Sequence, residues 1–129
     1  MDAELRREAA TLRIMGSEKA AEYLIQHYPR GSRRSGDALV LVQHLSWRVA
    51  DQMRLARHYL GGQPHASARV FEAFASFMSL RSFAQAVRDV WPERPDDQQL
   101  FRYNLGTAIR KYETSEANTA VIDALLNEH

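Results

Sequence analysis

The feature that most constrains the fold of this chain is an apolar stripe that recurs at steps of three and four residues. Its members are Ala38, Val42, Leu45, Val49, Met53, Ala56 and Leu60. This spacing is that of one side of an α-helix facing a core. No stretch of four to eight residues alternates apolar and polar positions as a half-buried strand does. The pattern predicts an all-α fold whose third helix is the longest, capped by Asp37 and ended by Gly61 and Gly62.

Capping and helix-breaking residues divide the rest of the sequence into further helical segments. The first expected segment runs from Ala3 to Met15, and the second, capped by Ser17, ends before Pro29. After the long third helix, a fourth segment covers residues 67–91. The fifth, capped by Asp96 or Asp97, reaches Tyr112, and the last is capped by Thr114 or Ser115. A shift of the apolar line in residues 78–82 indicates either a kink or two helices in the fourth segment. No internal repeat is evident. We expect a compact single domain, residues 1–129, built as a bundle of five or six helices.

The chemistry-bearing motifs of common enzyme classes are missing from this sequence. It has no cysteine, which excludes disulfides, thiolate metal sites and a cysteine nucleophile. It has no nucleophile elbow, zinc-protease helix, calcium loop or glycine-rich phosphate loop. No two histidines stand three or four residues apart, the spacing for one metal on a helix. The histidines are His27, His44, His58, His65 and His129.

We therefore expect a protein that is not an enzyme and that needs neither a cofactor nor a metal. An enzyme whose site is assembled across helices from arginine, histidine, aspartate and tyrosine remains the alternative. The first sixteen residues carry acids and arginines and lack the apolar run of a secretory signal. No window approaches the eighteen apolar residues of a membrane span. These observations predict a soluble, cytoplasmic protein without a membrane partner.

Charge is nearly balanced overall but is biased locally. The chain has 17 basic and 16 acidic residues, so its net charge of +1 provides no global attraction for nucleic acid. Residues 27–58, however, contain six arginines against two acids. Three of these arginines lie in the loop predicted at residues 29–36, which is rich in glycine, serine and proline. This region is the one sign-biased patch of any size.

The predicted third helix has a second row of residues, opposite its apolar stripe. The row is Val40, His44, Trp47, Asp51, Arg54 and His58. Tryptophan and arginine are enriched at the energetic centres of protein interfaces. Two other readings remain open: Trp47 belongs to a second core, or the charged residues form a solvated face. The predicted partner-binding residues are Arg30, Arg33, Arg34, His44, Trp47, Arg48, Asp51, Arg54 and His58.

These observations favour a small binding protein whose partner is another protein. An inhibitor or adaptor of the antitoxin or immunity type is the preferred version. The alternative is a nucleic-acid-binding domain that uses the Arg30–Arg34 loop and the third helix, or the fifth helix with its basic residues Arg102, Arg110 and Lys111. Salt separates the two, because phosphate binding weakens log-linearly with salt and a hydrophobic interface does not.

Overall fold

The structure, a computed structural model, describes residues 1–62 and 64–127, and this part of the chain is all-helical. Eight α-helices and one short 3-10 helix occur in it, without a strand. They are α1 (Ala3–Met15), α2 (Ser17–His27), α3 (Ser35–Gln43), α4 (Val49–Leu60), α5 (Arg69–Ala75), α6 (Leu80–Asp89), α7 (Pro95–Ile109), η1 (Arg110–Tyr112) and α8 (Glu116–Asn127). The predicted all-α class is confirmed, but five or six helices was too low a number. His129 lies outside the described residues.

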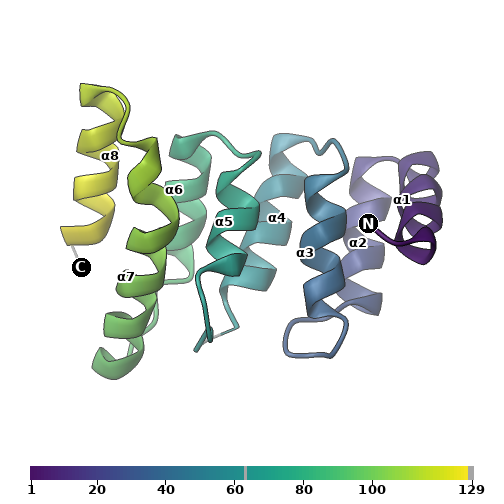
Figure 1. Cartoon of the computed structure of the whole chain (residues 1–129), viewed down its shortest axis with the longest axis horizontal. Coiled ribbons are helices and arrows are strands. Elements are labelled where there is room, and N and C mark those ends of the chain that lie inside the picture. Colours follow the sequence, from purple (N-terminus) through teal and green to yellow (C-terminus); the bar gives the residue numbers. More distant parts are fainter. Residues whose placement is uncertain (63, 128–129) are drawn as a thin grey trace.

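The helices form a stack of two layers. The strongest packing contacts join helices that are two places apart, with α2, α4, α6 and α8 in one layer and α1, α3, α5 and α7 in the other. Figure 1 shows consecutive helices running in opposite directions, with α1 and α8 at the two ends of the stack. The arrangement therefore repeats in space, although the sequence has no repeat. Stacked helical pairs of this kind present long edges made of loops.

One hydrophobic core runs between the layers and receives side chains from all eight α-helices. Aromatic side chains pack against one another in its second half. Phe71 of α5 and Phe101 of α7 meet edge to face with ring centroids 5.0 Å apart, and Trp91 meets Phe101 at 4.9 Å. Aromatic pairs in this geometry add to the energy gained by burying their area. These contacts hold the second half of the stack together.

The prediction of one helix across residues 37–60 is wrong, because the chain turns at residues 44–48. The indole N–H of Trp47 donates to the carbonyl oxygen of Val42 at 2.9 Å, which satisfies a carbonyl in the last turn of α3. Arg48 is extended, with φ −65° and ψ 153°. Both α3 and α4 turn an apolar side to the same core, which is why the stripe continues across the break.

The capping residues explain where several other helices begin. Asp2 caps α1 by accepting the Leu5 N–H at 2.8 Å, and α1 has the predicted bounds. The two-helix alternative for residues 67–91 is confirmed, and Ser79 caps α6 by accepting the Ser82 N–H. Ser115 accepts the Asn118 N–H at the start of α8.

Three predicted caps are wrong. Ser17 is the first residue of α2 after Gly16, and its hydroxyl contacts a different helix. Asp37 lies inside the first turn of α3, which starts at Ser35. The pair Asp96 and Asp97 lies in the first turn of α7, behind Pro95. Acidic residues in a first turn still interact favourably with the helix dipole.

In the described part of the chain, every helix is too short or too polar to cross a lipid bilayer.

Candidate binding site at the lower edge of the stack

The structure distributes the predicted partner-binding residues over two opposite edges of the stack. The lower edge in Figure 1 consists of the connections α2–α3, α4–α5 and α6–α7, and the upper edge consists of the other connections. Residues Arg30, Arg33 and Arg34 belong to the lower edge, and His58 lies in the last turn of α4 beside them. Residues His44, Trp47, Arg48 and Asp51 belong to the upper edge, and Arg54 lies halfway along α4. The single binding face expected from one long helix is therefore wrong.

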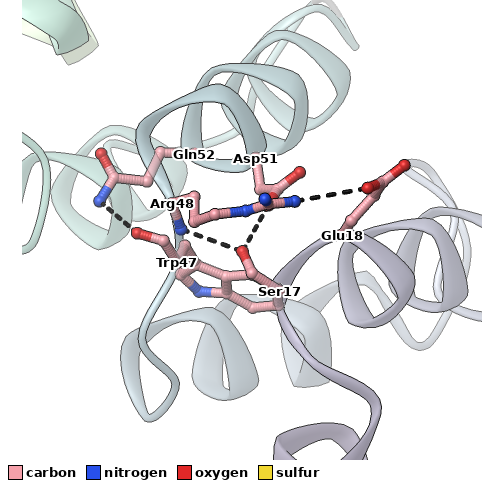
Figure 2. Close-up of polar contacts among 6 residues, drawn as sticks. All are labelled: Ser17, Glu18, Trp47, Arg48, Asp51 and Gln52. Atoms are coloured by element: carbon pink, nitrogen blue, oxygen red, sulfur yellow. Dashed lines mark hydrogen bonds and ion pairs between the residues drawn. The ribbon is translucent and has the colours of Figure 1, made fainter.

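At the upper edge, Trp47 is part of the core. The residue is 8% exposed, and its indole N–H donates to the Val42 carbonyl oxygen. Its carbonyl oxygen accepts a hydrogen bond from the Gln52 side chain at 3.3 Å, as Figure 2 shows. An indole that is buried and hydrogen-bonded within its own chain fixes the α3–α4 turn. The alternative in which Trp47 belongs to a core agrees with this placement.

A polar cluster next to Trp47 joins the first turns of α2 and α4. The Ser17 hydroxyl donates to Asp51 at 2.5 Å and accepts the Arg48 backbone N–H at 2.9 Å. The Arg48 side chain bridges Asp51 at 3.3 Å and Glu18 at 3.4 Å (Figure 2). Asp51 is only 5% exposed, so these bonds compensate the burial of its carboxylate. The cluster is a helix-packing contact that sequence reasoning missed, because Ser17 is 34 residues away from Asp51.

His44 and Arg54, the other predicted partner-binding residues away from the lower edge, are exposed. His44 follows the end of α3, and its carbonyl oxygen accepts a hydrogen bond from the Arg13 guanidinium at 3.1 Å. Arg13 thereby satisfies a carbonyl at the C-terminal end of α3. Arg54 is exposed on α4, and its side chain makes no hydrogen bond or ion pair within the described part of the chain.

At the lower edge, Arg30 and His58 are joined by two hydrogen bonds. The backbone N–H of Arg30 donates to Nε2 of His58 at 3.3 Å, and the Arg30 guanidinium donates to the His58 carbonyl oxygen at 3.1 Å. Since Nε2 accepts a bond, His58 is neutral with its proton on Nδ1. Gly31 follows with φ +78°, a conformation that glycine adopts without strain. The loop is thus fastened to the end of α4.

Arg34 points to another part of the molecule. Its guanidinium donates to the Tyr28 hydroxyl at 2.6 Å and lies 4.0 Å from the centroid of the Tyr28 ring. The Tyr28 hydroxyl in turn donates to Glu8 of α1 at 3.1 Å. Burial, together with the nearby Glu8 carboxylate, raises the pKa of Tyr28 to about 12. Arg34 therefore connects the loop to α1.

A pocket of about 220 Å³ lies between the α2–α3 and α4–α5 connections. Its walls come from the end of α4, from the segment leading into α5, and from Arg30, Gly31, Ser35, Gly36 and Leu39. Arg30 and Arg69 provide its charges, and His65 and Tyr59 provide polar rings. Glycine and alanine form much of the remaining surface. None of the lining residues that the structure describes is acidic.

The positive charges around the pocket are not neutralised by the chain itself. Arg69 and the loop residue Arg33 form no side-chain hydrogen bond or ion pair within the described part of the chain. The guanidinium of Arg30 uses one nitrogen on His58. The ion pairs found in the described residues lie elsewhere, in the Arg48 cluster, between Arg57 and Asp89, and between Arg110 of η1 and Glu113 just after it. The pocket is therefore an electropositive concavity.

The His65 and Tyr59 rings in the pocket wall are each held by hydrogen bonds to backbone carbonyl oxygens. Nε2 of His65 lies 2.7 Å from the Leu60 carbonyl oxygen, so this nitrogen carries a proton. Burial lowers the pKa of His65; the bond to Leu60 opposes this shift and the charge of Arg30 adds to it. The Tyr59 hydroxyl lies 2.8 Å from the Tyr28 carbonyl oxygen and 3.2 Å from that of Leu24, and burial raises the pKa of Tyr59. Tyr59 thus fixes α4 to the end of α2.

No group of three or more possible metal ligands lies close together in residues 1–62 and 64–127. Comparisons with known proteins give no match to a family model, to a curated sequence or to a solved structure.

Part of this site was predicted from the sequence and part was missed. The turn-forming composition of residues 29–36 drew attention to Arg30 and Arg33. Arg69 and His65 were missed, although the segment from Gly61 to Ser67 is also rich in glycine, proline and serine. That composition predicts a second loop, but only the stacking of α3 beside α5 brings the two loops together.

Proposed function

We propose that this protein is a non-enzymatic adaptor or inhibitor that captures a partner protein with the lower edge of its stack. The observation that carries the proposal is the electropositive pocket, which Arg30 and Arg69 both line and which has no acidic residue among its described lining residues. Arg33 extends the positive charge along the adjoining loop. The proposed interface thus retains the arginine loop predicted from the sequence. It replaces the Trp47 row with residues of the α4–α5 connection.

The size and setting of the pocket favour a macromolecular ligand. Pockets for small molecules and cofactors usually measure about 300–1,000 Å³. A pocket of about 220 Å³ is better suited to one side chain of a larger ligand. Arginine is enriched at protein interfaces, where its planar fork recognises carboxylates and phosphates. The layered helices hold the two loops on a well-packed support, which favours a preformed site.

Acidic residues near the pocket weigh against a nucleic-acid groove. Asp37 and Glu72 occupy the first turns of α3 and α5, the helices that follow the two pocket loops, and both are exposed. A continuous phosphate backbone crossing this edge would be repelled by them. A partner protein can place a single acidic group in the pocket and direct other groups to these carboxylates.

Site-specific photocrosslinking in the native host tests the proposal. A photoreactive amino acid replaces Ala66, an exposed lining residue of the pocket, or, as a matched control, Ala50, an exposed residue near the start of α4. We expect an adduct at position 66 that protease destroys and nuclease leaves intact. Replacing Arg30 and Arg69 together by glutamine should remove it. A nuclease-sensitive adduct, or equal adducts at positions 50 and 66, would overturn the proposal.

A further inference from the structure

We infer that the pocket is an oxyanion receptor, which takes one carboxylate or phosphate group between Arg30 and Arg69. This inference rests on the proposed function, because it specifies the chemical group that the partner inserts. Arg30 reaches the pocket from the α2–α3 loop and Arg69 from the first residue of α5. Two guanidinium groups on separate walls can bind different oxygens of one anion.

The Arg30 side chain is positioned before any ligand arrives. Its guanidinium donates to the His58 carbonyl oxygen, and its aliphatic part lies against Gly62. A Cβ atom at Gly62 would be 2.9 Å from Cδ of Arg30, closer than real carbon contacts allow. A Cβ atom at Gly61 would be 2.9 Å from Nη1 of Arg30. The two glycines at the end of α4 therefore make room for this arginine.

The pocket is open enough for a ligand group because several of its lining residues are small. Gly31, Gly36 and Ala66 contribute little or no side chain to the wall. For both Gly31 and Gly36, a Cβ atom would meet no other atom within 4 Å. Open space therefore lies beside the backbone at these positions. This space leaves room for a compact anion, and Arg30 and Arg69 reach the pocket through long side chains.

His65 gives the inference a spectroscopic signature. It lines the same pocket as Arg30, and that positive charge helps to keep its pKa low. An anion bound between the arginines would offset their charge and favour the protonated imidazole. The pKa of His65 should therefore rise when the ligand binds. A residue with a purely structural role would not change its titration when an anion is added.

The test is an NMR titration of the intact protein with small probes. Phosphoserine and glutamate, each blocked at both termini, represent the two sources of the anion, and blocked serine at matched ionic strength is the neutral control. We expect saturable shifts of the Gly31 and Gly36 amide signals and a rise in the pKa of His65 that saturates with them. The probe that saturates at the lower concentration identifies the anion as phosphate or carboxylate.

Two matched variants complete the experiment. Arg69→Gln should abolish the response to both anionic probes, whereas Arg54→Gln, on an exposed arginine of α4, should leave it unchanged. If the pKa of His65 is the same with anionic and neutral probes, or if Arg69→Gln responds like the wild type, the inference is wrong.

The photocrosslinking result separates this failure from failure of the proposed function. If position 66 forms an adduct but the anionic probes give no response, the proposed adaptor function is retained and the oxyanion receptor is refuted. An anion response without an adduct refutes the adaptor and assigns the pocket to a free small anion.

Discussion

The backbone N–H of Arg30 donates to Nε2 of His58, while the guanidinium of the same Arg30 donates to the His58 carbonyl oxygen. Both bonds fasten the arginine loop to the end of α4, and the first requires a neutral imidazole. Burial lowers the pKa of His58 below its ordinary value of 6.5, and the charge of Arg30 lowers it further. The geometry of the proposed interface is thus linked to the protonation state of His58.

Acidification should destabilise the folded protein. The pKa values of His58 and His65 are lower in the folded state than in the unfolded chain. Between the folded-state pKa and the unfolded-state pKa of each histidine, the unfolded chain binds more protons than the folded protein. The contribution of these histidines to stability is therefore fully present above pH 6.5 and is lost as pH drops through their folded-state pKa values. Urea denaturation at a series of pH values between 7.5 and 5 measures the effect.

Replacing His58 by glutamine should reduce the loss of stability between pH 7.5 and pH 5. His44→Gln is the matched control, because His44 is exposed and its contact with Arg13 is made by its backbone. An identical pH dependence in the wild type and in His58→Gln would contradict the assignment.

The Ser17–Asp51 contact should contribute measurably to stability. Ser17→Ala deprives the buried Asp51 carboxylate and the Arg48 N–H of a partner, and we expect a loss of about 1–3 kcal/mol in the free energy of unfolding. A double-mutant cycle with Asp51→Asn isolates the coupling between the two side chains. Ser46→Ala, on an exposed serine of the same edge, is the control. Additive effects of the two substitutions would show that the contact contributes nothing.

Trp47→Ala should unfold or strongly destabilise the protein, because it removes a buried indole from the α3–α4 turn. We expect a loss of about 3–5 kcal/mol. Trp47→Phe keeps an aromatic ring but loses the bond to the Val42 carbonyl, so it should cost less. Thermal unfolding followed by circular dichroism measures both variants. Wild-type stability in Trp47→Ala would show that the indole is not part of the core.

Two glycines of the pocket should respond differently to alanine. Gly62→Ala should displace the Arg30 side chain, whereas Gly36→Ala meets open space and replaces a helical glycine. We expect Gly36→Ala to be neutral or stabilising by up to about 1 kcal/mol. Gly62→Ala should weaken anion binding and shift the NMR signals of Arg30. Unchanged Arg30 signals in Gly62→Ala would contradict the described packing.

The helical class was predictable because apolar periodicity reports which side of each segment faces a core. The same signal could not reveal the break at residues 44–48. Val42 and Leu45 keep helical spacing across it, and the bond from the Trp47 indole to Val42 depends on the folded turn. Helix ends that depend on long-range partners, as at Arg48 and Ser17, leave no local pattern.

The candidate site was predictable only where its residues are local. The loop arginines stand out because glycine, serine and proline surround them. His65 and Arg69 lie more than thirty residues further along the chain, and nothing in the sequence indicates that their loop packs beside Arg30. Asp51 was misplaced for the opposite reason. Its charge indicated an exposed residue, but Asp51 is buried and its carboxylate accepts a hydrogen bond from the Ser17 hydroxyl.

The ladder-like packing of the helices has a mechanical consequence. Among the described residues, every extensive contact between α-helices joins helices no more than two α-helices apart, and α1 and α8 lie at opposite ends of the stack. A force that pulls those ends apart therefore loads the outermost helices first. The molecule should come apart in steps from its extremities inward, and the arginine pocket, built on the inner helices α3, α4 and α5, should survive the first of them.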